Sequence, residues 1–290
     1  MDVPSDAALH AYYARGEERE RLAQSRGEVE FERTKDVVLR RLPGPPSVVA
    51  DIGGGPGRYS LWPAGRGHRV EHRDLVPLHV EQLRAEAGPG PGIRTAVGDA
   101  RDLDLGDAAV DAVLLLGPLY HLRRRADRVR ALREARRVVR PGGPVFVAAI
   151  SRWAPRLDGV LTLRLYETRP QLRELVDEVE RTGWAPPLVP DSFSAYCHRP
   201  GQLRAELRAA GLEWSTWSAS KAWPSPWTTS TSGCATPWPA RSCSRAPGPS
   251  NGSRSCSASA PTCWRRPSGR RGRSPPSERP APVPAVGAEA

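Results

Sequence analysis

The chain has 290 residues, with 43 Lys+Arg against 32 Asp+Glu, a net charge of +11, and 39% hydrophobic residues. This length is enough for one or two domains with a buried core. No apolar run reaches about 18 residues and no secretory leader pattern is present, so we expect neither a membrane span nor export. The basic excess alone is typical of proteins that bind nucleic acid or an anionic membrane.

The basic excess is concentrated at the C-terminal end. Residues 1–213 contain 33 Lys+Arg and 30 Asp+Glu, which gives a net charge of +3. Residues 214–290 contain 10 Lys+Arg and only two acidic residues, which gives a net charge of +8. The C-terminal segment has four of the five Cys and 13 Pro, but no Leu, Ile, Phe, Tyr, Met or Asp. Because such a composition cannot offset the entropy cost of ordering, we expect residues 214–290 to be disordered.

Helical and strand-like patterns alternate in residues 1–213. Residues 7–42 are helical in pattern. Short apolar runs then predict five strands, at residues 47–52, 68–74, 93–97, 110–116 and 144–150. Helices are predicted to begin at Gly57 and to cover residues 77–87 and 126–139, the last ending at a Pro-Gly-Gly turn. This alternation predicts an α/β fold with a doubly wound, mostly parallel sheet.

The segment after the fifth predicted strand is an insertion, residues 151–200, with a helix around 171–181. A further helix at 202–210 ends at Gly211. We therefore divide the chain into an N-terminal helical segment (1–46), a core (47–213) and a C-terminal tail (214–290).

A glycine cluster directly follows the first predicted strand, as Asp51-x-Gly53-x-Gly55-x-Gly57. Glycines let backbone N–H groups approach a ligand closely, because no Cβ intervenes. A dinucleotide-binding loop would have its third glycine at position 58, which is Arg, and this disfavours a nicotinamide-dependent reductase. Asp51 instead favours S-adenosylmethionine, which carries a cationic amino group and a sulfonium but no pyrophosphate.

The segment VVADIGGGPGRYS resembles motif I of the class I S-adenosylmethionine-dependent methyltransferases. Three further motifs follow in the family's order, and the resemblance covers about residues 10–213. It implies a Rossmann-like fold, an N-terminal helical lid over residues 1–46, methyl transfer as the activity and S-adenosylmethionine as the cofactor. The cofactor-binding residues that it implies are Asp51, Gly53, Gly55, Gly57, Asp74, Leu75, Asp99, Ala100, Gly117, Tyr12, Tyr13 and Arg21.

The resemblance also implies roles for individual residues. Asp74 would bond the ribose hydroxyls, and Asp99 would accept a hydrogen bond from the adenine amino group. Tyr12, Tyr13 and Arg21 resemble the family's lid over the cofactor. Each position has an alternative interpretation: a tight turn for the glycines, a helix cap for either aspartate, and an ordinary amphipathic helix for the lid.

Methyl transfer is an in-line displacement, so the protein mainly aligns the two reactants, which can lower the barrier by roughly 7–11 kcal/mol. A base is needed only if the acceptor must lose a proton. His121 is the first candidate for that base, with Tyr120 positioning the acceptor, because LLLGPLYHL resembles the motif that faces cofactor and substrate. Tyr196 and His198 are second candidates, because the insertion before them is expected to form the acceptor pocket. The alternative interpretations are a structural role for His121 and loop packing for Tyr196 and His198.

The sequence indicates no metal site, because Cys197 and His198 lack partners and the tail cysteines form no CxxC element. One Cys in residues 1–213 fits a reducing cytoplasm. We expect a small-molecule methyl acceptor and neither nucleic acid nor membrane as partner; no oligomeric state is indicated. The alternative is an RNA-binding protein or RNA methyltransferase that uses the Arg and Trp residues of the tail.

A shifted reading frame would explain the composition of the tail. If GC-rich codons are assumed, a shift of one register converts residues 226–241 (PWTTSTSGCATPWPAR) into VDDLDERLRDPVA, which restores the missing Leu and Asp. We interpret residues 214–290 as a frameshift product. By the resemblance, this would remove the sixth strand and the antiparallel seventh strand of the family's sheet, and leave the edge of strand 144–150 unpaired.

Overall fold

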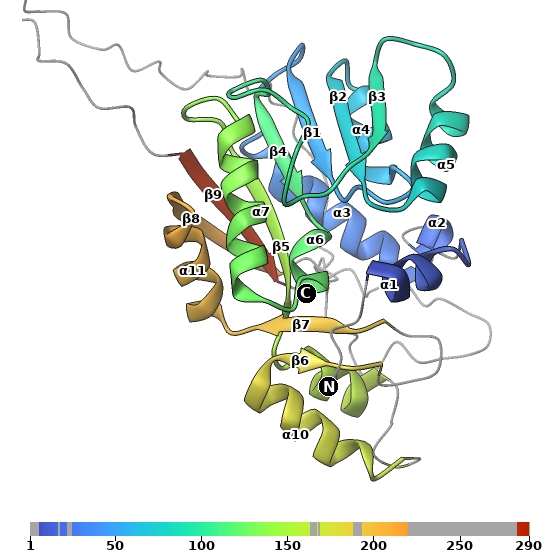
Figure 1. Ribbon diagram of the computed structural model, residues 1–290, viewed down its shortest axis with the longest axis vertical. Coiled ribbons are helices and arrows are strands. Elements are labelled where there is room, and N and C mark those ends of the chain that lie inside the picture. The colour runs from blue at the N-terminus through green and yellow to red at the C-terminus, as the bar shows by residue number, and fades with distance from the viewer. Residues whose placement is uncertain are drawn as a thin grey trace, which may run out of the picture. The chain divides into compact units, whose positions relative to one another are not determined.

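The computed structural model describes residues 6–16, 18–21, 25–162, 167, 169–187, 193–219 and 283–289. Its central feature is a parallel sheet in the order β3-β2-β1-β4-β5 (Figure 1). The five strands are β1 (Val48–Ile52), β2 (Arg69–Asp74), β3 (Ile93–Val97), β4 (Ala112–Leu115) and β5 (Val145–Ser151). The predicted α/β, doubly wound sheet is therefore confirmed, and the strand order reverses between β1 and β4, where such sheets bind ligands.

Helices connect the strands as the alternating pattern predicted. The connecting helices are α4 (Arg58–Ala64), α5 (Pro77–Ala87), α6 (Pro118–His121) and α7 (Arg125–Val138). Both α5 and α6 begin at a proline, whose missing N–H and restricted φ suit the first turn of a helix.

The two faces of the sheet are buried against different helices. Val113 and Leu115 of β4 face α7, whereas Ala112 and Leu114 face the other side. This alternation follows from the two-residue period of a strand and explains why the central strands are apolar throughout.

The N-terminal segment has three helices: α1 (Asp6–Tyr13), α2 (Glu18–Arg21) and α3 (Ser25–Leu39). In α3, Phe31 and Val38 are buried in the same core cluster as Val49 of β1. Within the expected lid segment 1–46, α3 therefore belongs in part to the packed core.

The insertion contains α8 (Ala154–Leu157), the π-helix η1 (Asp158–Thr162), α10 (Leu172–Thr182), β6 (Trp184–Ala185) and β7 (Ala195–His198). The predicted helix around 171–181 corresponds to α10. The strand β7 was not predicted; it pairs in parallel with the end of β5 and antiparallel with β6. Helix α11 (Pro200–Ala209) follows and packs beside α7 on one face of the sheet (Figure 1).

The C-terminal strands differ from the expectation. Strand β8 (Leu212–Ala219) runs past residue 214, and β9 (Val283–Glu289) lies between β5 and β8, parallel to both. The expected loss of both strands and the unpaired edge of β5 are therefore not observed. The physical reason is that an open strand edge offers a row of unpaired N–H and C=O groups, with which another extended segment of the chain can pair.

Candidate active site

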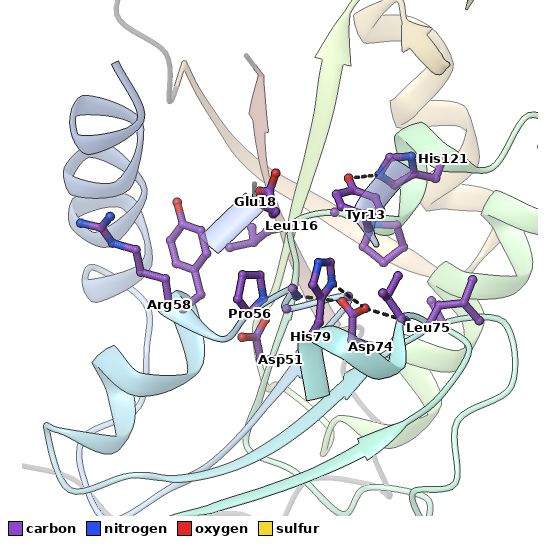
Figure 2. Close-up of a pocket in the computed structure, with 18 of the residues that line it drawn as sticks. Tyr13, Glu18, Asp51, Pro56, Arg58, Asp74, Leu75, His79, Leu116 and His121 are labelled. Atoms are coloured by element: carbon purple, nitrogen blue, oxygen red, sulfur yellow. Dashed lines mark hydrogen bonds and ion pairs between the residues drawn. The ribbon is translucent and has the colours of Figure 1, made fainter. Parts of the chain in front are cut away.

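A cavity of about 450 Å³ lies at the carboxyl ends of β1, β2 and β4, within the size range of small-molecule sites (Figure 2). Residues from α1 to α6 and from the segment after β3 complete its wall. Of the residues named above, those that line the cavity are Tyr13, Asp51, Gly53, Gly55, Asp74, Leu75, Asp99, Ala100, Gly117, Tyr120 and His121. Tyr12, Gly57 and His198 do not line it, and the side chain of Arg21 lies outside the described residues.

The glycine loop needs residues without side chains for two reasons. Gly55 (φ +58°) and Gly57 (φ +94°) adopt the left-handed backbone conformation that other residues rarely adopt. A Cβ on Gly57 would also collide with the side chain of Leu83 on α5. At Gly55 a Cβ would meet only Glu18, at 3.9 Å, so this glycine leaves the backbone open to the cavity.

Asp51 is the next-to-last residue of β1, directly before this loop, and is 1% exposed. Its carboxylate accepts a hydrogen bond of 2.7 Å from the Ser60 hydroxyl. Burial raises the pKa of Asp51 to about 7; the Ser60 hydrogen bond opposes this rise, and the charge of Asp74 adds to it. The site therefore contains a buried carboxyl whose charged form a neighbouring cation would stabilise.

Asp74 ends β2 and accepts three hydrogen bonds. Oδ2 accepts from the Gly55 N–H at 2.8 Å, and Oδ1 accepts from the Val76 N–H at 2.9 Å and from His79 Nδ1 at 3.0 Å. Burial alone would raise the pKa of Asp74, but the His79 and backbone hydrogen bonds outweigh it and hold the pKa below its ordinary value. Asp74 is thus ionised, and it ties the glycine loop to the start of α5.

Asp99 is paired with Arg101 in the structure. The Arg101 guanidinium donates to both carboxylate oxygens, with Nε at 3.0 and 2.9 Å, and the Arg101 backbone N–H donates at 2.8 Å. Burial alone would raise the pKa of Asp99, but the hydrogen bonds and charge of Arg101 outweigh this effect and hold the pKa below its ordinary value. An adenine amino group would therefore share this carboxylate with Arg101, a partner that the sequence analysis did not identify.

Helix α1 brings an aromatic residue onto the cavity wall. The Tyr13 hydroxyl lies 2.9 Å from His121 Nε2, and the Tyr13 ring packs edge-on against His79 and His121, with centroids 5.0 and 5.6 Å apart. Tyr12 packs against Tyr13 and against Phe193 of the insertion. The structure thus places α1 over the cavity, next to the predicted base.

His121 and Tyr120 both lie on α6 at the end of β4. Their rings pack edge-on, 4.6 Å apart. Burial lowers the pKa of His121 to about 4, with a small opposing effect from the charge of Asp74. His121 is therefore a neutral imidazole at physiological pH, the form that can accept a proton.

His198, the second candidate base, is not brought to this cavity. It is fully buried, and its Nε2 lies 3.1 Å from Glu206, which also pairs with Arg128. Tyr196 packs on His198 and under the Arg128 guanidinium. The structure therefore does not support the expected catalytic roles of His198 and Tyr196, because pairing of β7 with β5 places both side chains in this network and not in the cavity wall.

His79 is a further cavity residue that the sequence motifs did not indicate. It lies in the first turn of α5, five residues after Asp74, and lines the cavity. A usable signal was present in the sequence: Pro77 sets the start of the helix, so that His79 is placed near the carboxylate at the end of β2.

No helix in the described part of the chain is both long and apolar enough to cross a membrane. Among the same residues, no group of three or more His, Cys, Asp or Glu side chains is arranged to hold a metal ion.

Residues 50–147 match the family described as Methyltransferase domain. The chain is similar to the ubiquinone/menaquinone biosynthesis C-methyltransferases UbiE of Caulobacter vibrioides (36% identical over 129 residues; 41% of this chain and 50% of the relative) and Acidiphilium cryptum (40% over 122 residues; 41% and 48%). It is also similar to the probable tRNA methyltransferase 9B of Bos taurus (33% over 115 residues; 40% and 23%). The chain spans about half the length of the UbiE relatives. The match and these similarities cover the strands and motifs that line the cavity, and they support the expected resemblance to S-adenosylmethionine-dependent methyltransferases.

Proposed function

We propose that the cavity holds S-adenosylmethionine across the ends of β1, β2 and β4, and that the chain methylates a small-molecule acceptor beside Tyr120 and His121. The residues present fit this cofactor. Asp51 and Asp74 supply carboxylates for its cationic groups and ribose hydroxyls, and Gly55 lets the backbone approach it. When bound, the cofactor supplies an activated methyl group.

The part played by the protein in the reaction is alignment and, for an acceptor with a labile proton, removal of that proton. His121 Nδ1 is buried and has no hydrogen-bond partner within the described residues. If Nε2–H donates to the Tyr13 oxygen, Nδ1 carries the lone pair and accepts the acceptor's proton. Tyr13 then sets the tautomer of His121, and the ring of Tyr120 lies against the same imidazole.

The observation that carries the proposal is the neutral imidazole on the wall of a cavity that also contains the glycine loop. The test is methyl transfer from labelled S-adenosylmethionine to a panel of hydroxyl, amine and carbon acceptors, by the full chain and by His121→Asn. For acceptors with a labile proton, we expect the variant to lose about 10²–10⁴-fold in turnover with unchanged cofactor affinity. A melting temperature that rises with NADPH but not with S-adenosylhomocysteine would refute the cofactor assignment of the cavity.

RNA is the second candidate acceptor, because one relative is named a probable tRNA methyltransferase and an arginine-rich face lies on α7 and α11. On these neighbouring helices, Arg130, Arg133, Arg204 and Arg208 are exposed. Such a face can contact phosphates, with an affinity that falls as salt rises. Label transferred to bulk RNA rather than to the small-molecule panel would favour this function over the first.

A further inference from the structure

His79 of α5 is almost entirely buried beside the cavity, with a side chain that is 3% exposed. Its Nδ1 lies 3.0 Å from Oδ1 of Asp74. Because an ionised carboxylate can only accept, Nδ1 must carry the hydrogen of this bond. In the neutral ring, Nε2 then has a lone pair and acts as an acceptor.

This Nε2 atom has no hydrogen-bond partner among the residues that the structure describes. Buried polar atoms are nearly always paired, so an orphaned acceptor in the wall of a binding cavity points to a donor on the ligand. His198 Nδ1 is also buried without a described partner, but it lies in the network around Glu206 and not in the cavity wall. His79 is distinguished by its place next to Asp74 (Figure 2).

Asp74 itself retains capacity to accept. Its two oxygens have about four lone-pair directions, and three N–H groups occupy three of them. The cavity wall therefore presents two neighbouring acceptors, the remaining lone pair of Asp74 and Nε2 of His79. On S-adenosylmethionine, the only two adjacent hydroxyl donors are those of the ribose.

We propose that Nε2 of His79 accepts a hydrogen bond from one ribose hydroxyl of the cofactor while Asp74 accepts from the other. This inference rests on the proposed placement of the cofactor. The competing interpretation is that His79 only orients Asp74 and does not touch the ligand.

Two substitutions separate these roles. In His79→Asn the side-chain amide can replace Nδ1 and keep the bond to Asp74, but nothing replaces Nε2. In His79→Gln the longer side chain can place an acceptor where Nε2 lies, but the bond to Asp74 is lost. Both variants keep a polar group in the wall, and their melting temperatures without ligand show whether the fold is intact.

The experiment is calorimetric titration of the full chain with S-adenosylhomocysteine and with its 2′-deoxy and 3′-deoxy analogues. In the wild type, we expect loss of the hydroxyl that meets His79 to weaken binding about three- to tenfold. His79→Asn should weaken binding of S-adenosylhomocysteine by a similar factor. This variant should bind S-adenosylhomocysteine and the analogue that lacks the hydroxyl meeting His79 with equal affinity, whereas His79→Gln should still bind S-adenosylhomocysteine more tightly than that analogue.

The inference is overturned if His79→Asn binds S-adenosylhomocysteine as tightly as the wild type, or if it weakens binding of S-adenosylhomocysteine and both analogues equally. The second result would assign His79 a purely orienting role. A wild-type chain that binds no S-adenosylhomocysteine would refute the proposed function itself, and this inference with it.

Discussion

Replacing Arg128 with methionine should destabilise the fold by about 3–5 kcal/mol. Arg128 and Glu206 are each 2% exposed, and the guanidinium donates to the carboxylate with Nη2 at 2.7 Å and Nε at 3.0 Å. Nη1 also donates to the carbonyls of Leu122 and Arg123, both at 2.8 Å. Methionine fills part of the volume but leaves a buried carboxylate and two carbonyls without these donors.

The double variant Arg128→Met/Glu206→Met should recover more than half of this loss, because replacing both members of a buried ion pair by apolar residues is often nearly neutral. A matched surface control is Arg181→Ala, which removes an i,i+3 pair with Glu178 in which the side chains are 72% and 47% exposed. Its cost should stay below about 0.5 kcal/mol.

Urea denaturation at pH 7, followed by circular dichroism, measures all three free energies of unfolding provided that the slope with urea concentration is unchanged. The reasoning is refuted if Arg128→Met costs no more than Arg181→Ala. It is also refuted if the double variant is as unstable as the single variant, since the loss would then not come from the unpaired charge of Glu206.

Three further predictions follow from the site and from the C-terminal strands. The pKa of Asp51 is raised to about 7 from 3.8, so the folded state binds a proton that the unfolded state releases between these values. Asp51 therefore lowers the free energy of unfolding as pH rises through that window. Asp51→Asn should remove this part of the pH dependence, as measured by melting temperatures from pH 4.5 to 8. The same pH dependence in the wild type and the variant would contradict the prediction. Gly57→Ala should cost about 2–6 kcal/mol through its φ of +94° and its collision with Leu83, whereas Gly90→Ala, with open space around it, should change unfolding by less than about 1 kcal/mol. Finally, we propose that residues 214–290 are out of frame. A frame-corrected chain should melt higher, because Pro284 has no N–H to donate to the ladder between β8 and β9. Equal melting temperatures, or a shifted frame without a Leu-containing extension, would argue against this.

The electrostatics of the site explain why the two predicted functional groups behave differently. Asp51 and His121 are both desolvated, which favours the neutral form of each and moves their pKa values in opposite directions. His121 is thereby neutral, while a nearby cation would favour the charged form of Asp51. A cationic ligand should therefore lower the pKa of Asp51 on binding.

The alternation of strands and helices and the glycine motif were readable from local sequence. The periodicity of strands and helices is a local property of the sequence, and so is the presence of Pro and Gly where these elements begin and end. For this reason β3 and α5 have the bounds that were predicted. His198 shows the limit of such reasoning. The insertion before it was expected to form the acceptor pocket, but the pairing of β7 with β5 and the packing of His198 against Glu206 depend on the tertiary structure.

The amino-acid sequence alone determined the fold class, the order along the chain of the first five strands and their connecting helices, and the place of the glycine loop. These features depend on periodicity and on the backbone freedom of glycine. Only the tertiary structure decided which side chains share the cavity. It placed Tyr13 on His121 and His79 on Asp74, moved α3 into the core and gave Asp99 the partner Arg101. The contact of Tyr13 with His121 and the burial of α3 join residues far apart in the chain, and local pattern does not record which of them meet.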